Sequence, residues 1–128
     1  MDILSSRILL HPTDLSRTRH FYRAVLGLAV YREFGDPENP ATVFYCGGGF
    51  VEVSGGGTAG PPSGIALWLQ VRDLAAEHQR LGAAGVPILR APTLEPWGLL
   101  EMWITDPDGV RIVLVEVPEN HPLRRDQR

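Results

Sequence analysis

Residues 6–16, SRILLHPTDLS, place a histidine and an arginine where a short apolar strand leads into the start of a helix. His11, at the end of the strand, can bind a metal, contact a bound molecule or simply precede the turn at Pro12. Arg7 stays protonated and offers no lone pair, so it can hold an anion but cannot bind a metal. The chemistry of this stretch therefore depends on which of the two side chains faces a binding site.

Tryptophans and carboxylates are the other side chains of chemical interest. Trp68, Trp97 and Trp103 have flat faces that stack on conjugated molecules or on cations. Glu52 and Glu101 are candidate acid–base groups. Together these residue types favour a small-molecule site, because such sites combine apolar walls with a few polar groups.

The remaining histidines and the cysteine indicate no further site. His20 and His78 fall within predicted helices, and His121 lies close to the C-terminus. Cys46 is expected to be a small, buried, unreactive residue, because the sequence promises no positive charge beside its thiol. The GGG runs lack the Lys-Ser or Lys-Thr ending and the following helix of a phosphate loop.

Length, charge and composition exclude several classes of protein. The 128 residues suffice for one domain with a sizeable core, and 44% of them are hydrophobic. The net charge of −3 argues against a nucleic-acid partner, and no apolar run is long enough for a membrane span. One cysteine rules out an internal disulfide, and the acidic N-terminus lacks the apolar stretch of a signal peptide. We expect a cytoplasmic protein with no nucleic-acid and no membrane partner.

The elements that must position these side chains occur in the same order twice. Alternation and helical spacing predict a strand, a helix and three further strands in each half of the chain. The predicted single domain, residues 1–118, contains one repeat at about 5–54, the linker GGGTAGPPSG at 55–64 and a second repeat at about 65–117. A polar tail at 119–128 is expected to be extended or mobile.

Local signals predict where the helices begin and end and where the strands turn. Thr13 and Asp14 supply N-cap oxygens for the first helix, and Gly27 is suited to end it. The second helix, within RDLAAEHQRLGAAG, ends in the same way at Gly85. The sequence DPDG at 106–109 predicts a tight turn between the last two strands.

The repeat carries three segments that resemble the vicinal oxygen chelate superfamily: DLSRTRHFYRAVLGL, VRDLAAEHQRLGAAGV and DPDGVRIVLVE. This superfamily includes glyoxalase I, fosfomycin-resistance enzymes, extradiol dioxygenases and bleomycin-resistance proteins. The resemblance covers residues 5–117 and implies an α+β fold, in which two βαβββ repeats form a curved eight-stranded mixed sheet with a concave pocket. It also implies a homodimer that binds a small-molecule ligand, as is usual for small family members.

The resemblance also locates the positions at which the enzymes of this family hold a divalent metal. Counted from the motifs, these positions are Arg7, Glu52, Ala66 (or Ile65) and Val113. Only Glu52 offers a metal-binding group, whereas a mononuclear site needs about three or four ligands on one surface. We therefore expect no metal site and no cofactor.

The same alignment, with the alternation of strand side chains, implies which residues line the concave face. The expected ligand-binding residues are Arg7, Leu9, His11, Phe50, Glu52, Trp68, Gln70, Trp97, Trp103 and Arg111, and the candidate catalytic residues are Glu52 and Glu101. Arg7 either anchors an anionic or carbonyl-bearing ligand or pairs with Glu52 across the pocket floor. His11 either contacts a ligand at the mouth of the pocket or only ends the strand.

Three functions are compatible with this pattern, and we favour the first. It is a metal-independent binding protein of the bleomycin-resistance type, which sequesters a flat, partly aromatic molecule and so confers resistance. The second is a metal-free isomerase, cyclase or lyase that uses Glu52, Glu101 or His11 as its acid–base group. The third is a glyoxalase-like or dioxygenase-like metalloenzyme with displaced ligands at these same three residues.

Overall fold

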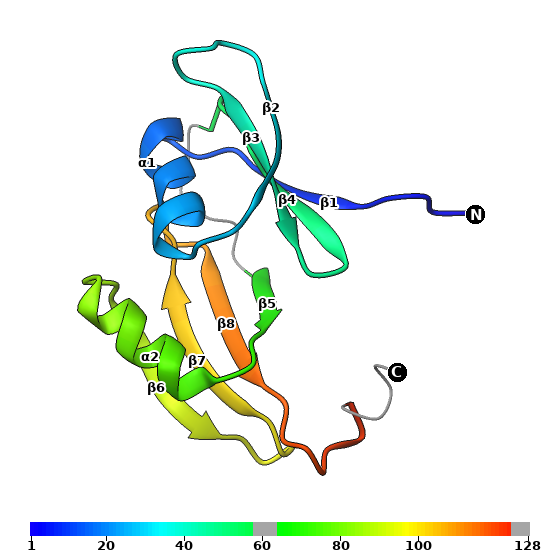
Figure 1. Ribbon diagram of the computed structural model, residues 1–128, viewed down its shortest axis with the longest axis vertical. Helices are drawn as coiled ribbons and strands as arrows, with labels where there is room; N and C mark the ends of the chain where they lie inside the picture. Colours follow the sequence, from blue (N-terminus) through cyan, green and yellow to red (C-terminus); the bar gives the residue numbers. More distant parts are fainter. Residues whose placement is uncertain (58–63, 124–128) are drawn as a thin grey trace. The chain divides into compact units, whose positions relative to one another are not determined.

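The computed structural model describes residues 1–57 and 64–123, which contain two βαβββ repeats (Figure 1). This order confirms the predicted α+β fold, and the eight strands form two four-stranded mixed sheets. Parts of the predicted linker and tail, residues 58–63 and 124–128, lie outside the described residues.

The chain divides into two compact units, each of which contains one repeat. Unit 1 is Met1–Pro61 with Pro107–Gly109, and unit 2 is Pro62–Asp106 with Val110–Arg128. The turn Pro107–Gly109 thus belongs to unit 1, although its neighbours along the chain are the last two strands of unit 2.

Unit 1 is a sheet with the strand order β1-β4-β3-β2 and a helical segment against it. Strand β1 runs parallel to β4, and the other neighbours are antiparallel. Its elements are β1 (Arg7–Leu10), α1 (Leu15–His20), the π-helical turn η1 (Phe21–Val25), β2 (Val30–Phe34), β3 (Ala41–Cys46) and β4 (Gly49–Val53).

The helical segment of unit 1 begins and ends where the sequence predicts. The carboxylate of Asp14 accepts a hydrogen bond from the backbone N–H of Arg17 at 3.0 Å, which satisfies one free amide of the first turn. Gly27 follows the segment with a φ of 79°, a conformation that suits glycine. Tyr22 is fully buried, and its ring lies 6.4 Å from that of Phe44, so the segment covers the face of the sheet that Phe44 shares.

The opposite face of this sheet is the helix-free face of unit 1. Strand side chains alternate, so residues that pair directly in register share a face. Arg7 pairs with Phe50, and Glu52 pairs with Leu9 on one side and Val43 on the other. The helix-free face of unit 1 therefore carries Arg7, Leu9, Val43, Tyr45, Phe50 and Glu52.

Unit 2 repeats this plan, with the strand order β5-β8-β7-β6 and helix α2 along one side (Figure 1). The carboxylate of Asp73 caps α2 by accepting from the N–H of Ala76 at 3.0 Å, and Gly85 follows the helix with a φ of 80°. The elements are β5 (Ala66–Gln70), α2 (Leu74–Ala83), β6 (Ile88–Leu94), β7 (Leu100–Thr105) and β8 (Arg111–Glu116).

The two faces of the second sheet also follow the predicted alternation. The side chains on the α2 side of β5, β7 and β8 are almost all buried, with Leu69 only partly so; they include Leu67, Leu69, Met102, Ile104, Ile112 and Leu114. The helix-free face of unit 2 carries the alternate set, Trp68, Gln70, Arg90, Glu101, Trp103, Thr105, Arg111, Val113 and Val115.

Strand β6 contains a proline. It runs from Ile88 through Pro92 to Leu94. A proline is tolerated there because β6 is an edge strand and its register with β7 shifts between Arg90 and Thr93. A second register shift, between Ile88 and Arg90, accompanies the pairing of Arg90 directly opposite Trp103.

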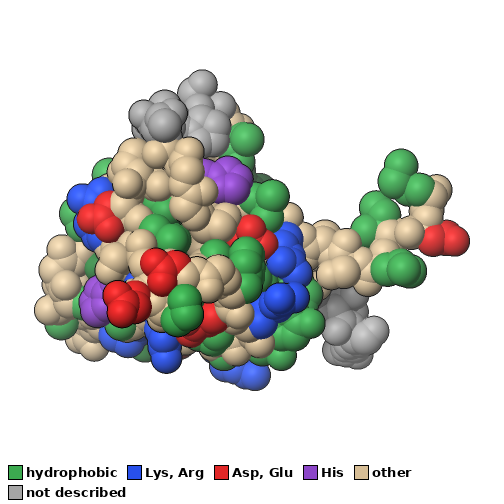
Figure 2. All heavy atoms as spheres, turned by 90° about the horizontal axis from the view of Figure 1, so that it is seen from above, with side chains coloured by type: hydrophobic (Ala, Val, Ile, Leu, Met, Phe, Trp, Pro, Cys, Tyr) green, Lys and Arg blue, Asp and Glu red, His purple; other side chains and the backbone are tan. Residues whose placement is uncertain are grey.

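On the face shown in Figure 2, acidic and basic side chains are interspersed with hydrophobic ones. Among the described residues, none of the helices is long and apolar enough to cross a membrane.

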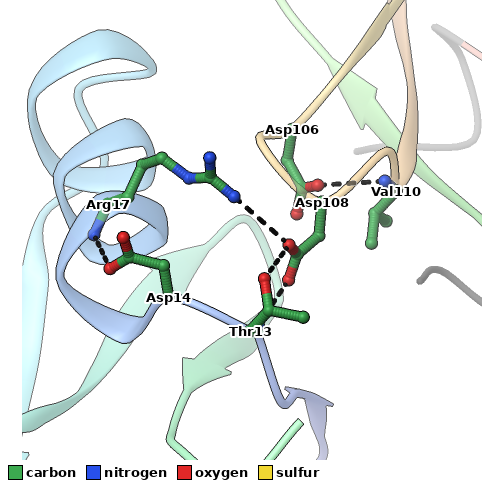
Figure 3. A network of polar contacts seen from close by, with 6 residues as sticks. All are labelled: Thr13, Asp14, Arg17, Asp106, Asp108 and Val110. Atoms are coloured by element: carbon green, nitrogen blue, oxygen red, sulfur yellow. Dashed lines mark hydrogen bonds and ion pairs between the residues drawn. The ribbon is translucent and has the colours of Figure 1, made fainter. Parts of the chain in front are cut away.

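The predicted DPDG turn forms, and its second aspartate is a strong acceptor within unit 1 (Figure 3). Asp106 closes the turn by accepting from the N–H of Val110 at 2.9 Å. Asp108 accepts from the N–H of Thr13 at 2.8 Å and from its hydroxyl at 2.7 Å, and Arg17 lies 3.5 Å from the same carboxylate. Asp108 therefore holds the chain between β1 and α1.

Replacing Asp108 should destabilise the protein. Asp108→Ala leaves the Thr13 N–H and hydroxyl without their acceptor, so we expect a loss of about 1–3 kcal/mol in the free energy of unfolding. Urea denaturation measures it. Glu119→Ala, which removes the carboxylate of an exposed residue, is the matched control and should change stability by less than about 0.5 kcal/mol. Equal midpoints for the two variants would contradict this role.

Candidate functional site

The residues expected to line a pocket fall into two groups, one on each unit. Unit 1 holds Arg7, Leu9, His11, Phe50 and Glu52; unit 2 holds Trp68, Gln70, Trp97, Glu101, Trp103 and Arg111. Most of these side chains lie on the two helix-free faces. His11 follows the end of β1, and Trp97 lies in the loop between β6 and β7.

The polar residues of unit 1 form a chain of hydrogen bonds. Arg7 and Glu52 make the predicted ion pair, with Nη1 2.9 Å from Oε1. The Ser54 hydroxyl donates to the other carboxylate oxygen of Glu52 at 3.0 Å and lies 3.3 Å from Nδ1 of His11. Because the serine proton goes to Glu52, Nδ1–H of His11 must be the donor to Ser54, and Nε2 is left as an acceptor.

His11 is exposed and lies just beyond β1, which ends one residue earlier than the sequence predicts. The backbone hydrogen bonding between β1 and β4 still extends to the end of β1, because the N–H of Ser54 donates to the carbonyl of Leu10 at 3.0 Å. Gly57 passes directly over the His11 backbone: a Cβ at this position would lie 1.5 Å from the His11 carbonyl oxygen. Only glycine fits here, so the glycine run serves to let the chain pass close to His11.

The positions at which the family holds a metal do not fit one in this chain. Ala66 and Val113 have no donor atom, and Arg7 offers none. Glu52 remains, but both of its oxygens already accept hydrogen bonds, from Arg7 and from Ser54. Elsewhere in residues 1–57 and 64–123, no group of three or more His, Cys, Asp or Glu side chains is arranged to hold a metal ion.

Three aromatic rings lie side by side in unit 1, and we call them the aromatic array: Tyr31, Tyr45 and Phe50. Their ring centroids are 4.8 Å apart for Tyr31 and Phe50, 5.2 Å for the two tyrosines and 5.7 Å for Tyr45 and Phe50. Tyr31 is 46% exposed and Tyr45 is 49% exposed, so the array presents ring surface to solvent. An exposed cluster of this kind is suited to stack on a flat ligand.

Sequence analysis identified Phe50 but missed the two tyrosines. The GGG turn could have predicted Tyr45, since pairing Cys46 with Gly49 places Tyr45 opposite Phe50. Tyr31 could not be predicted in this way, because the register of β2 shifts between Val30 and Arg32.

Trp103 is the centre of the helix-free face of unit 2. Two guanidinium groups lie over its ring, with the Cζ atom of Arg90 4.9 Å and that of Arg111 5.0 Å from the ring centroid. Arg90 also pairs with Glu95, whose side chain is buried. The indole N–H of Trp103 is buried, and no described residue accepts a hydrogen bond from it.

Glu101, the second candidate catalytic residue, is buried on β7. It is 6% exposed and accepts a hydrogen bond from the indole N–H of Trp97 at 2.7 Å. The loop before β7 folds so that Trp97 covers the carboxylate while its ring remains 57% exposed. Nearby, Trp68 is 48% exposed on β5, where it pairs in register with Val113.

The segment that follows β8 is packed rather than extended, at least as far as Leu123. The valines of β8 on the helix-free face are buried, and Leu123 and Trp103 pack against the cluster that they form with Leu99 and Val117. His121 holds the segment: its Nδ1 accepts from the N–H of Leu123 at 3.2 Å, so Nε2–H donates to the carbonyl of Trp97 at 3.0 Å. The sequence does not predict this packing, because the residues around Leu123 are mostly polar.

The family model described as Glyoxalase/Bleomycin resistance protein/Dioxygenase superfamily matches residues 6–114. The chain therefore belongs to this superfamily, and the resemblance noted in its sequence is confirmed. No curated relative matches the sequence.

Several solved structures share the fold. TioX from Micromonospora sp. ML1 is 21% identical with a TM-score of 0.75, over 89% of this chain and 98% of that one. A superfamily member from Sphaerobacter thermophilus DSM 20745 is 24% identical with a TM-score of 0.74, over 90% and 98%. TnmS3, an antibiotic binding protein from Streptomyces sp. CB03234, is 19% identical with a TM-score of 0.76, over 91% and 98%. At these identities the likeness shows the fold alone.

The ion pair of Arg7 with Glu52 should be worth more than a fully solvated pair. The Glu52 side chain is 13% exposed and its partner 33%, so we expect a coupling free energy of about 1 kcal/mol. A double-mutant cycle with Arg7→Gln and Glu52→Gln, followed by urea denaturation, measures it. The control cycle is Arg23 with Glu33, which are 3.5 Å apart and more exposed, and it should give a value near zero. Equal couplings would contradict the prediction.

Cys46 should react slowly with thiol reagents. It is half-buried at the end of β3, and burial raises the pKa of its thiol above the ordinary value. A raised pKa lowers the fraction of reactive thiolate at any pH below it. At pH 7.5 the folded protein should therefore react more slowly with Ellman's reagent than the urea-unfolded chain, and the difference should narrow as pH rises. Equal rates at pH 7.5 would show an unhindered thiol.

Proposed function

We propose that this protein binds a flat, partly aromatic small molecule on its helix-free faces and acts by sequestering it, without a metal. The observation that carries the proposal is the aromatic array, in which Tyr31 and Tyr45 keep about half of their surface exposed beside Phe50. Soluble proteins have little reason to expose clustered rings unless a partner or ligand covers them.

The exposed tryptophans support the same function in unit 2. Trp68 and Trp97 expose roughly half of their surfaces, and both are large rigid rings that bind planar molecules at a low cost in entropy. Polar groups lie beside both sets of rings, as in most small-molecule sites: the Arg7–Glu52 pair in unit 1 and Arg111 in unit 2.

We propose metal independence because the side chains at the family's metal positions offer too few metal-binding groups. The family's metal positions hold one carboxylate, and that carboxylate is already bonded to Arg7 and Ser54. The antibiotic-binding relative TnmS3 shows that this fold accommodates a protein named for binding rather than for catalysis. As the resemblance to small family members suggests, we take the binding form to be a cytoplasmic homodimer.

The first test is binding of 9-anthracenemethanol, a planar and uncharged probe. We expect it to quench tyrosine fluorescence where it binds unit 1 and tryptophan fluorescence where it binds unit 2. We expect Tyr45→Ala to weaken the first binding event and Trp68→Ala the second, each about tenfold, because stacked rings contribute about 0.5–1.5 kcal/mol beyond their buried area. Leu94→Ala is the control: this residue is 64% exposed, and its register partner Leu100 lies on the face beneath α2. It should leave the dissociation constant unchanged.

Three results would contradict the proposal. No binding of this probe or of other planar compounds would exclude the ligand class, and one equivalent of bound zinc, nickel, manganese or iron in the purified protein would exclude metal independence. Conversion of a bound compound, lost in Glu52→Gln and His11→Gln, would instead favour an acid–base enzyme. The specific observation behind that second candidate is the chain of hydrogen bonds from Glu52 through Ser54 to His11, which leaves Nε2 of an exposed histidine without a partner among the described residues.

A further inference from the structure

We propose that Arg111 and Trp103 form an anion-binding subsite, and that the flat ligand carries a carboxylate that binds there. This inference rests on the proposed function and adds the charge of the ligand to it. It follows from two hydrogen-bond donors on one face of unit 2 that lack an anionic or neutral acceptor among the described residues.

The first donor is the guanidinium of Arg111. It lies at the start of β8, is exposed, and stacks 5.0 Å from the Trp103 ring centroid. Among the described residues no carboxylate pairs with it. Stacking on an aromatic face orients a guanidinium but leaves its N–H groups directed outward in the ring plane, where they can make the two parallel bonds that a carboxylate accepts.

The second donor is the indole N–H of Trp103. It is buried and has no acceptor within residues 1–57 and 64–123. A buried donor without a partner is rare in native proteins, because the group loses its hydrogen bond to water and gains none in return. Trp97, another tryptophan of unit 2, shows the contrast, since its N–H is bonded to Glu101. A ligand oxygen that reaches Trp103 would satisfy the only one of these two indoles that lacks a partner in the described structure.

The charges around Trp103 also favour an anion at one particular end of the ring. The charge of Arg90 is offset by Glu95, while that of Arg111 is not offset among the described residues. Glu101 lies two residues along β7 toward the other end of the face and pairs in register with Val115. Thr105 pairs with Arg111 and adds a hydroxyl on the same face. A carboxylate beside Arg111 and Thr105 is thus placed away from the buried glutamate.

A matched pair of probes tests the charge: 2-naphthoate and the neutral 2-naphthalenemethanol have the same ring system. We expect 2-naphthoate to bind about tenfold more tightly at low salt, since hydrogen bonds between charged groups are roughly twice as strong as neutral ones. This preference should shrink as ionic strength rises. Arg111→Gln should abolish the preference by weakening binding of the anionic probe far more than that of the neutral probe, and Trp103→Phe, which keeps a ring but removes the N–H, should reduce it. The control Arg72→Gln removes the same charge from an exposed residue between β5 and α2 and should preserve the preference.

A second measurement separates this proposal from the proposed function. Titration with sodium acetate, with sodium chloride as the control, should shift the indole N–H resonance of Trp103, which Trp103→Phe identifies. If both naphthalene probes fail to bind but acetate shifts this resonance, the subsite stands and the flat-ligand function is wrong. If the neutral probe binds as tightly as the anionic one and acetate causes no shift, the anion subsite is wrong and the proposed function stands. If neither probe binds and acetate causes no shift, both proposals are wrong.

Discussion

Each βαβββ unit has one helix for one four-stranded sheet, and the rest of the structure depends on this imbalance. Strand side chains alternate between two faces, and one helix covers only one of them. In unit 1 the helical segment buries the face of Phe44, and in unit 2 α2 lies over that of Ile104 and Ile112. The side chains of the opposite face must then pair with one another, be covered by another segment of chain, or be covered by a ligand.

The two units meet this requirement in different ways. In unit 1 the polar residues pair among themselves, from Arg7 through Glu52 to Ser54, while the rings of the aromatic array stay partly exposed. In unit 2 the segment after β8 returns to the sheet, and Leu123 packs against the buried valine cluster. Leu123 thus covers the apolar part of this face. The guanidinium of Arg111 and the indole N–H of Trp103 are polar groups of the same face. The same architecture thus produces one face that is polar and internally paired, and one on which Arg111 and the indole N–H of Trp103 lack acceptors among the described residues.

The sequence predicts those parts of the molecule that depend on neighbouring residues or on regular pairing. The cap at Asp14, the helix end at Gly85, the DPDG turn and the ion pair of Arg7 with Glu52, one of the two alternatives for Arg7, all follow from local chemistry or from the register of adjacent strands. The prediction fails where irregular backbone sets the geometry. A register shift in β2 places Tyr31 in the aromatic array, a register shift in β6 between Ile88 and Arg90 accompanies the pairing of Arg90 with Trp103, and the fold of one loop buries Glu101.

The contrast between Arg7 and Arg111 shows why residue type and face alone do not define a binding group. Both arginines lie on helix-free faces, and sequence analysis treated both as ligand contacts. Arg7 has a carboxylate 2.9 Å away, so an anionic ligand would have to compete with Glu52 for it. Arg111 has an aromatic ring instead, which orients the guanidinium but neutralises none of its charge. A ligand carboxylate therefore gains more beside Arg111 than beside Arg7, because at Arg111 it breaks no existing ion pair among the described residues. Within unit 2, the preference for a charged ligand should accordingly be set by Arg111.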